Sequence, residues 1–415
     1  MAATYDAVVI GAGVMGASSA LQLAAAGLKK VVVVEKAAGI GFGSTGKSSA
    51  CIRQTYANPA VCLMAHEALQ LFKNWGEFTG LRQTRAAFNN CGVLFLMGPA
   101  DAAVPHVMEV HRQVGVASEQ LDADEAQRRF PDLHLCATPL DLQADRHECG
   151  QGLQAIHELE GGFADPVGTT EDMLEAARAL GVQLRLGARV VRLLQRGGRV
   201  AGVVLAAGGG EETLYAGAVV NCAGPWAMGI NDEAGVGLPQ RLAATRNQIV
   251  CKQFPEKLAG PLPMVADMVN GIYFRPDPTG GMIVLGSARE EDENEQVADP
   301  DHYQEGADAP FREQKLTLLH HRVATFRARG TITSYSGLYT VNLEDYHPII
   351  DRSELEGFFP VCGFSGHGFK LSPVVGMIVA QKVLGQWGRG RTQVPLDFFD
   401  RGRAPLKSHW GGVMA

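Results

Sequence analysis

Two glycine-rich stretches hold residues that can contact a charged ligand. In GFSGHGFKLSP (363–373), a histidine and a lysine stand among three glycines, just before an apolar run that suits a helix. The lysine would place a cation at the start of that helix, where it could bind an anionic ligand. In IGAGVMG (10–16), Gly11, Gly13 and Gly16 have the G-x-G-x-x-G spacing of a turn that approaches a pyrophosphate.

The elements around the second stretch identify a dinucleotide as the expected ligand. Asp6 to Ile10 form an apolar run typical of a buried parallel strand, and Ala17 to Ala26 read as a small-residue helix whose N-terminus can hold the phosphates. A second strand, Val31 to Val34, ends in Glu35, about 20 residues past the glycines, where an acid can bond a ribose hydroxyl. Glu35 would repel a 2′-phosphate.

The composition of the 415-residue chain narrows its class. With 46% hydrophobic and 20% charged residues, it can bury a large core and form two domains. The formal charge of -7 argues against a nucleic-acid partner. The eight cysteines include no C-x-x-C pair, so we expect reduced thiols and no metal. A strand that starts by residue 6 and the lack of a long apolar stretch predict no signal peptide, no transmembrane segment and a cytoplasmic location.

The order of elements predicts an α/β protein with a Rossmann-like cofactor domain and a second, α+β domain built on an antiparallel sheet. Residues 241–335 alternate between short apolar strands, which is typical of such a sheet. Gly208 to Gly210 lie between two alternating strands and predict a hairpin turn rather than a second phosphate loop. The expected boundaries are 1–90, 151–225 and 336–395 for the cofactor domain, 91–150 and 226–335 for the substrate domain, and 396–415 for a C-terminal tail.

Five motifs occur in the order found in a known enzyme family. IGAGVMG…VVVVEK, GSTGKSS, GGFADP, VVNCAGPWA and GFSGHGFKLSPVVG together resemble the FAD enzymes of the D-amino-acid oxidase, glycine oxidase and sarcosine oxidase family. The similarity spans nearly the whole chain and is greatest to the sarcosine oxidase and dimethylglycine dehydrogenase branch. It implies a glutathione-reductase-type FAD domain and oxidation of the C–N bond of a small amine or N-substituted amino acid. Hydride would pass to flavin N5, and water would hydrolyse the imine.

The resemblance also implies which residues bind FAD. The loop 44–49 would place Ser44, Thr45, Ser48 and Ser49 beside the ribityl chain and phosphates and Lys47 close to the flavin ring. Plain loop solvation is an equal alternative for any one serine. Val190 would meet adenine, and the glycines of 363–368 would let a helix start touch the flavin ring, whose reduced form is negatively charged. The expected cofactor-binding residues are Gly11, Gly13, Met15, Gly16, Glu35, Lys36, Ser44, Thr45, Lys47, Ser48, Ser49, Ala50, Val190, Ala223, Gly224, Trp226, Gly337, Leu338, Gly363, Gly366, His367, Gly368, Phe369 and Lys370.

Four residues resemble the family's substrate site. Lys370 and Arg53 match the cations that bind the substrate carboxylate, Arg as a fork and Lys as a point charge. Tyr273 matches an aromatic wall of the substrate cavity, and His367 matches a histidine that orients or tunes the flavin. The alternatives are a solvated helix-cap lysine for Lys370 and a core tyrosine for Tyr273.

The sequence departs from the family pattern at the flavin attachment site and near the expected oxygen site. Gly337 stands where monomeric sarcosine oxidases have the cysteine that attaches flavin, and the loop after Glu35 lacks the histidine used by the other branch, so we expect noncovalent FAD. Val284 aligns, within one residue, with the lysine whose charge favours electron transfer to O2. This favours a dehydrogenase over an oxidase.

Other interpretations stay open from the sequence alone. The substrate could be a D-amino acid or a cyclic imino acid, and the electron acceptor could be a quinone, an electron-transfer protein or O2. A nicotinamide-linked reductase would need a second dinucleotide site. A flavin-binding subunit of a larger electron-transfer complex would bind FAD with little turnover, and a homo-oligomer or a partner subunit is compatible with the sequence.

Overall fold

Parallel apolar strands form the centre of the first sheet. The computed structural model describes residues 3–254, 258–277, 281–327 and 329–406. Strand β1 pairs in parallel with β2 and β12, and the order continues to β9 on one side and to the antiparallel β11 and β10 on the other. The strands of this sheet are β1 (Ala3–Ile10), β2 (Val31–Val34), β9 (Gln183–Arg185), β10 (Arg189–Arg196), β11 (Arg199–Ala207), β12 (Gly210–Asn221), β18 (Ile349–Ile350) and β19 (Phe358–Cys362).

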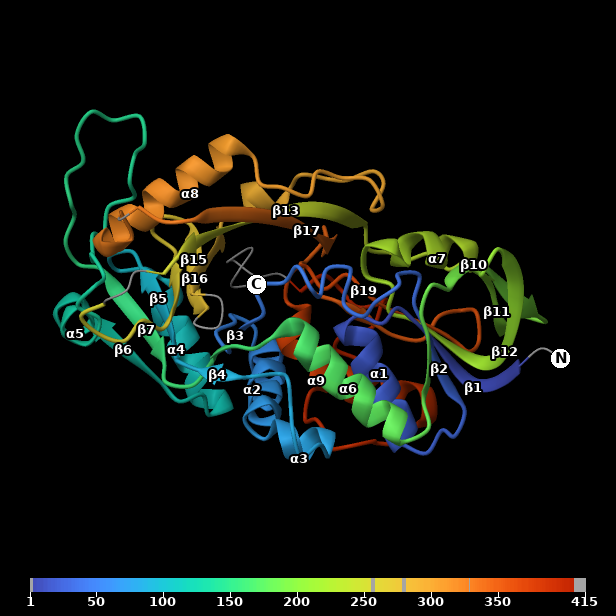
Figure 1. The fold of residues 1–415 in the computed structure, drawn as a ribbon. Coiled ribbons are helices and arrows are strands. Elements are labelled where there is room, and N and C mark those ends of the chain that lie inside the picture. Colours follow the sequence, from blue (N-terminus) through green and yellow to red (C-terminus); the bar gives the residue numbers. More distant parts are fainter. Residues whose placement is uncertain (1–2, 255–257, 278–280, 328, 407–415) are drawn as a thin grey trace.

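Helices cover one face of this sheet (Figure 1). Leu21 of α1, Leu174 of α6 and Val375 of α9 share one buried cluster with Val9 and Val33 of the strands. Val8 and Val32 on the other face belong to a second buried cluster, so the parallel centre of the sheet is apolar on both faces. The helices of this half are α1 (Val14–Ala25), α2 (Pro59–Lys73), α3 (Trp75–Thr79), α6 (Pro166–Ala179), α7 (Ala227–Glu233) and α9 (Gly368–Leu384).

A second, eight-stranded sheet, ordered β17-β13-β16-β15-β14-β5-β7-β6 in the described part of the chain, forms the other half of the molecule. Its pairs are antiparallel except for β14 and β5, which run parallel. Its strands are β5 (Val93–Met97), β6 (Ser118–Asp122), β7 (Gln154–Glu158), β13 (Leu242–Gln253), β14 (Met264–Asp267), β15 (Ile272–Asp277), β16 (Met282–Ser287) and β17 (Ile332–Asn342).

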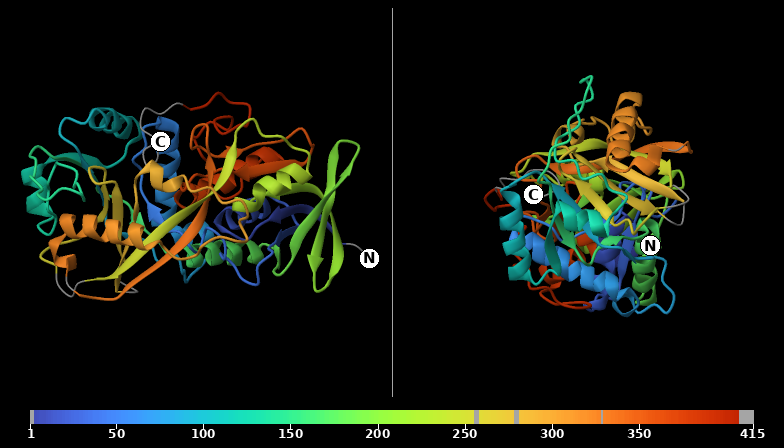
Figure 2. Two further views of the ribbon diagram at one scale, coloured as in Figure 1. Left: turned by 90° about the horizontal axis from the view of Figure 1, so that it is seen from above. Right: turned by 90° about the vertical axis from the view of Figure 1, so that its left-hand side faces the viewer.

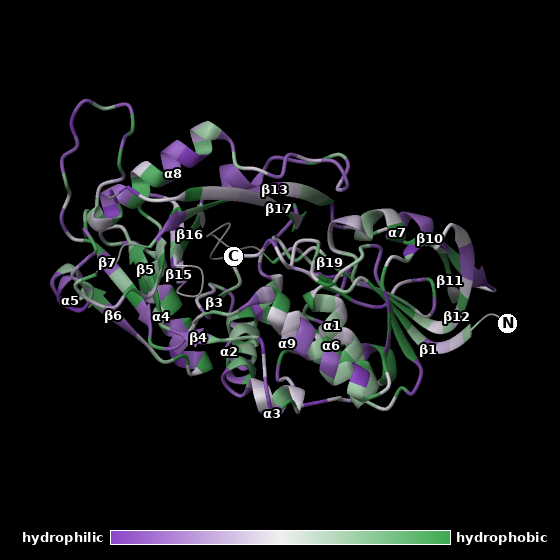
Figure 3. Ribbon diagram, viewed as in Figure 1, coloured by the Kyte–Doolittle hydropathy of each residue, from purple (hydrophilic) through white to green (hydrophobic). Residues whose placement is uncertain are grey.

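The two faces of the second sheet bury different clusters. Leu318 and Leu319 of α8 (Ala309–Arg322) pack on Phe274, whereas Val104 of α4 (Ala103–Val114) packs on Phe95. The short α5 (Ala123–Arg129) lies near β6 (Figure 2). A third, three-stranded sheet is formed by β3 (Cys51–Ile52), β8 (Gly162–Phe163) and β4 (Asn89–Asn90). Apolar residues concentrate in the strands and in α1 and α9, and polar residues in the surface loops (Figure 3).

The structure confirms the α/β class, the mainly antiparallel second sheet and the hairpin at Gly208 to Gly210, whose strands β11 and β12 pair directly. The helices α2 and α3 follow each other directly and meet at Asn74, which has non-helical backbone angles. The expected domain boundary at 335/336 falls inside β17, and β7 lies in the second sheet. The strands therefore cross between the halves more often than the boundaries 151–225 and 336–395 allow.

The end of the described chain packs against the first half. Phe399 is fully buried, its carbonyl accepts the N–H of Ile350, and Arg403 pairs with Asp345 at 2.9 Å. Residues 407–415 of the expected tail lie outside the described residues. Among the helices that the structure describes, none has the length and apolar character needed to cross a membrane.

Candidate functional site

A cavity of about 590 Å³ opens at the carboxyl ends of β1 and β2. This is the edge at which open α/β sheets bind their ligands. Most residues expected to bind the cofactor line it, and they come from segments far apart in the sequence. The expected residues in its wall are Gly11, Gly13, Met15, Glu35, Lys36, Ser44, Thr45, Lys47, Ser48, Val190, Ala223, Gly224, Trp226, Leu338, Gly363, Gly366, Gly368 and Phe369.

The glycine turn between β1 and α1 depends on two close approaches. Gly11 has φ +100°, and a Cβ there would lie 2.6 Å from the carbonyl oxygen of Cys222. A Cβ on Gly16 would lie 1.9 Å from the carbonyl oxygen of Gly11, so only glycine lets α1 pack this closely on the turn. The carboxylate of Glu35 accepts the N–H groups of Ala12 and Ala37 at 2.8 Å, which fixes the acid in the cavity wall.

At the expected adenine end, charged and aromatic groups form one cluster in the cavity wall. The ammonium of Lys36 lies 3.5 Å from the ring centroid of Trp226 and pairs with Asp301. The indole N–H of Trp226 donates to Asp301 at 3.0 Å, and Arg189 pairs with the same carboxylate at 3.1 Å. Val190 follows on β10. This network holds a flat, partly apolar wall that suits a purine ring.

The loop of residues 41–50 fits a phosphate and polyol ligand. The hydroxyl of Thr45 accepts the N–H of Val14 at 3.1 Å, so the loop covers the first turn of α1. Ser44 Oγ is buried in the cavity wall with no hydrogen-bond partner among the described residues. A buried polar atom without a partner is costly, which a ligand hydroxyl or phosphate oxygen would relieve. The expected FAD therefore fits the residues present.

Lys47 closes this loop against the second half. Its ammonium donates to the phenol of Tyr303 at 2.6 Å and to Glu305 at 2.8 Å. A Cβ on Gly337 would lie 2.8 Å from Cβ of Lys47. The position that carries the flavin-attaching cysteine in sarcosine oxidases is thus packed against Lys47, where a larger side chain would force a shift.

The start of α9 approaches the same cavity. Gly366 has φ +79°, and a Cβ there would lie 2.6 Å from the ring of Tyr339, while a Cβ on Gly368 would lie 2.8 Å from Met15. Both glycines line the cavity, and the close neighbours leave no room for a side chain at either position. The free N–H groups and positive dipole end of this helix start suit a ring that becomes negatively charged on reduction.

Arg53 and Lys370 are two buried cations beside this wall. They are 4% and 6% exposed, and Lys370 follows two residues that line the cavity. The Arg53 guanidinium lies 4.3 Å from the ring centroid of Tyr56 and donates to the carbonyl of Thr55. Burial, and then the charge of Arg53, lowers the pKa of Lys370 to about 7. The charge of Arg53 thus acts on Lys370.

Burial disfavours the charged form of both His367 and Tyr273. His367 Nδ1 is 3.1 Å from the phenol of Tyr56, and burial followed by the charges of Lys370 and Arg53 holds the pKa of His367 well below its usual value. The phenol of Tyr273 donates to Ser49 Oγ at 3.0 Å, and burial raises its pKa. An imidazole that stays neutral and has a fixed partner fits an orienting role better than that of a base.

Eight expected site residues do not line the cavity. Ala50 is fully buried with φ +50°, and its N–H donates to Ser48 Oγ, so it shapes the loop. Gly16 packs α1, and Gly337 contacts Lys47 as described. The other five are not among the residues that line the cavity: Ser49, Arg53, Tyr273, His367 and Lys370.

Sequence reasoning missed two acids that act on the cations. Glu158 of β7 is fully buried and accepts the N–H groups of Gln54 and Thr55, at 2.9 and 2.6 Å, which fixes the backbone next to Arg53. Glu293 lies in the charged run that reads as a surface loop. Burial and two neighbouring acids raise the pKa of Glu293 to about 8, against the charges of Arg53 and Lys370. Only the fold reveals that this run faces the site.

A third missed residue, Arg275 of β15, lies directly opposite Val284 of β16. Opposite residues of an antiparallel pair share a face. Val284 is 4% exposed, and Arg275 is 6% exposed and donates to the carbonyl of Ser49 at 2.5 Å. The guanidinium of Arg275 lies 4.3 Å from the ring centroid of Phe163. The face that carries Val284 therefore has a fixed cation of its own.

Residues 6–382 match the DAO family, described as FAD dependent oxidoreductase. The chain is 27% identical to monomeric sarcosine oxidase of Streptomyces avermitilis, over 96% of this chain and 98% of that protein. It is 27% identical to FAD-dependent oxidoreductase domain-containing protein 1 of Xenopus laevis, over 91% of this chain and 79% of that protein. L-proline dehydrogenase from P. horikoshii superimposes with a TM-score of 0.80 at 25% identity, over 97% and 98%. The chain therefore belongs to the DAO family of FAD-dependent oxidoreductases.

Proposed function

We propose that this oxidoreductase oxidises the C–N bond of a small amine or N-substituted amino acid that carries a carboxylate. The observation that carries the proposal is the pair of buried cations, Arg53 and Lys370, beside the cofactor cavity. A guanidinium and an ammonium are the side-chain groups that bind carboxylates, Arg as a fork and Lys as a point charge, so a substrate carboxylate would bind beside them. The names of the relatives, sarcosine oxidase and L-proline dehydrogenase, agree with this substrate class.

The other side chains of the site would orient the substrate. Bound FAD would supply the hydride acceptor. Tyr273 would form a wall that stays uncharged because burial raises its pKa. His367 would hold Tyr56 and remain neutral, and the charge of Glu293 would act on the site through both cations. The roles assigned to Arg53, Lys370, His367 and Tyr273 are part of the proposal.

We further propose that FAD is bound noncovalently and that electrons leave to a carrier, a quinone or an electron-transfer protein, more readily than to O2. The first point follows from Gly337, which packs against Lys47 and offers no thiol. FAD should then leave the protein on acid denaturation. The second follows from the buried aliphatic Val284.

Anaerobic reduction by matched pairs of compounds tests the substrate class. Glycine derivatives, D-amino acids and cyclic imino acids would each be compared with the corresponding amide, which keeps the nitrogen and loses the carboxylate charge. We expect the acid of at least one pair to reduce the bound FAD at least about tenfold faster than its amide, since one lost charged hydrogen bond costs about 1.5–3 kcal/mol. Equal rates for acid and amide in every pair would make a neutral amine the better substrate class.

A further inference from the structure

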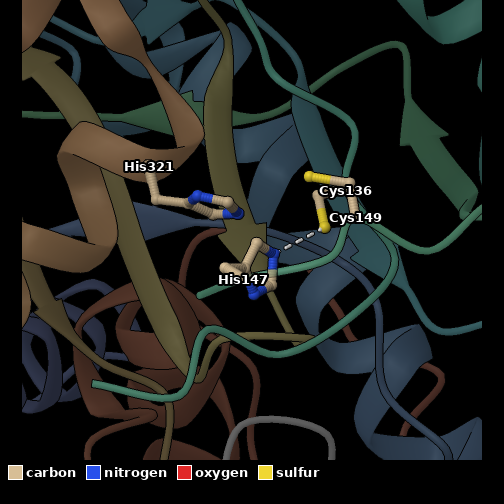
Figure 4. Close-up of side chains that lie close together, drawn as sticks. All are labelled: Cys136, His147, Cys149 and His321. Atoms are coloured by element: carbon tan, nitrogen blue, oxygen red, sulfur yellow. Dashed lines mark hydrogen bonds between the residues drawn. The ribbon is translucent and has the colours of Figure 1, made fainter. Parts of the chain in front are cut away.

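Two cysteines and two histidines meet in the second half, away from the cofactor cavity. Cys136, His147, Cys149 and His321 each offer one ligand atom, and these atoms all lie within 4.8 Å of one another (Figure 4). None of the four lines the cavity. From this cluster we propose a Zn²⁺ site with two thiolate and two imidazole ligands.

The geometry is close to that of a tetrahedral site. Zinc bonds of about 2.3 Å to sulfur and 2.0–2.1 Å to nitrogen give ligand–ligand separations of about 3.4–3.8 Å. Cys136 Sγ and His147 Nε2 are already 3.2 Å apart, and the rings of His147 and His321 meet edge to face at 4.8 Å between centroids. The widest separation has to shorten by about 1 Å, which side-chain rotation can provide.

One ligand atom is buried without a partner. His321 Nε2 is buried and makes no hydrogen bond among the described residues. A buried imidazole nitrogen normally has a partner, and a metal ion is one that the neighbouring thiols and imidazole could share. Two thiolates would also neutralise the charge of the ion. Thiolate and imidazole ligands select Zn²⁺ over Mg²⁺ or Ca²⁺.

The surrounding structure holds the ligands together before any ion binds. Arg322, fully buried at the end of α8, pairs with Asp267 at 2.7 Å and donates to the carbonyl oxygens of His134 and Cys136. This ties the segment of Cys136 to the helix that carries His321. Gly150 N–H donates to Thr138 Oγ1 at 2.9 Å, which brings the two ends of the intervening loop together.

The site would be structural. Its four protein ligands leave no open position for a substrate. The ion would join both ends of the loop 137–150, which projects from the second half in Figure 1, to the end of α8. Cys149 is exposed and His147 half-buried, so an ion can enter from solvent. His134 Nδ1 is 3.2 Å from the carbonyl oxygen of His321, to which it donates, and its Nε2 is 3.5 Å from Cys149 Sγ. The ring would therefore position Cys149 relative to α8, and it would donate to both neighbours as an imidazolium.

Sequence spacing could not predict this site. The expectation of no metal came from the absence of C-x-x-C, whereas these ligands come from two loop ends and a helix that are up to 185 residues apart, from Cys136 to His321.

Metal analysis of the FAD-loaded protein, purified with reductant and without chelator, tests the proposal. We expect one Zn²⁺ per chain, and Co²⁺ exchanged into the site should give the visible bands of a tetrahedral thiolate complex. Cys136→Ser and His321→Asn should each weaken zinc binding by more than about 100-fold, and His134→Asn by roughly 10–100-fold. Cys91→Ser, outside the cluster, should bind zinc as the wild type does. FAD content and anaerobic flavin reduction should not change on zinc removal, which separates this site from the proposed function.

Three results would overturn it. The first is that fully reduced wild-type protein binds no zinc. The second is that the Cys136→Ser/Cys149→Ser variant binds zinc as well as the wild type does. The third is that Cys136 and Cys149 form a disulfide that persists under reducing conditions. The Co²⁺ spectrum of the wild type decides the question even if a variant fails to fold.

Discussion

Arg53 and Lys370 have different surroundings although both would bind one carboxylate. Arg53 is held by Thr55 and Tyr56, whereas Lys370 lies in the first turn of α9. Replacing either with methionine keeps the volume and removes one charged partner of the substrate. We expect anaerobic flavin reduction to slow by roughly tenfold to a hundredfold, from about 1.5–3 kcal/mol, while FAD stays bound. Stopped-flow absorbance and the FAD-to-protein ratio measure both. Unchanged reduction rates in both variants would show that the carboxylate binds elsewhere.

The titration of Lys370 predicts how ligand binding depends on pH. Its pKa is lowered to about 7, so the cation is present below that pH and is lost as the pH rises. Glu293, with a pKa raised to about 8, gains negative charge over the next unit. Both changes weaken the binding of a ligand carboxylate. The affinity for an unreactive carboxylate ligand, followed by the flavin spectrum, should therefore fall from pH 6 to pH 9.

The matched variants separate the two groups. The arginine of Lys370→Arg keeps its charge at every pH of this range, so only the decrease in affinity near pH 8 should remain. The double variant Lys370→Arg/Glu293→Gln should lose that decrease as well. An affinity that rises with pH in the wild type would contradict the assignment of Lys370 to the ligand carboxylate.

At the scale of elements, the packing of α1 on the glycine turn has no room for a side chain. A Cβ on Gly16 meets the Gly11 carbonyl at 1.9 Å, so Gly16→Ala should push α1 away from β1. We expect a loss of about 1–3 kcal/mol in the free energy of unfolding and a lower FAD content. Gly217→Ala is the control, because a Cβ there meets nothing within 4 Å. Thermal unfolding of both variants checks this, and equal stability would mean that the turn adapts.

The proposed preference for a carrier over O2 rests on strand β16. Val284 brings no charge to its face, and the cation opposite it, Arg275, is already bonded to the Ser49 carbonyl. We expect reduced protein to reoxidise slowly in air-saturated buffer and fast with a phenazine or quinone dye, as followed by stopped flow. Reoxidation by air as fast as turnover with the best dye would end the dehydrogenase proposal. Arg275→Met would then test whether this arginine supplies the missing charge.

How much the sequence could predict depended on whether a feature is local. The strand, glycine turn, helix and Glu35 follow one another within 30 residues, so β1, α1 and β2 were predictable, as was the hairpin at Gly208 to Gly210. Glu158, Glu293 and Arg275 act on residues more than 100 positions away or across a sheet. Their spacing carries no signal, and the charged run around Glu293 resembles any solvated loop.

At the scale of the whole molecule, the site joins the two halves. The first sheet supplies the glycine turn and Glu35, while the second supplies Tyr273 and, through Glu158, the support for Arg53. Neither half contains a complete site. Asp301, Tyr303 and Leu338 of the second half also line the cofactor cavity. The feature that would distinguish an enzyme from a flavin-binding subunit with little turnover is the proposed substrate site, to which the second half would contribute Tyr273.

The absorption spectrum of the FAD-loaded protein under anaerobic conditions tests this account most directly. We predict that a small carboxylate-bearing amine from the glycine, D-amino-acid or cyclic imino-acid series bleaches the oxidised flavin band, and that one equivalent of the best substrate suffices. Dithionite, which reduces any accessible flavin, is the control for a competent cofactor. If dithionite reduces the flavin but no amine of these series changes the oxidised band, the assignment of amine oxidation is contradicted.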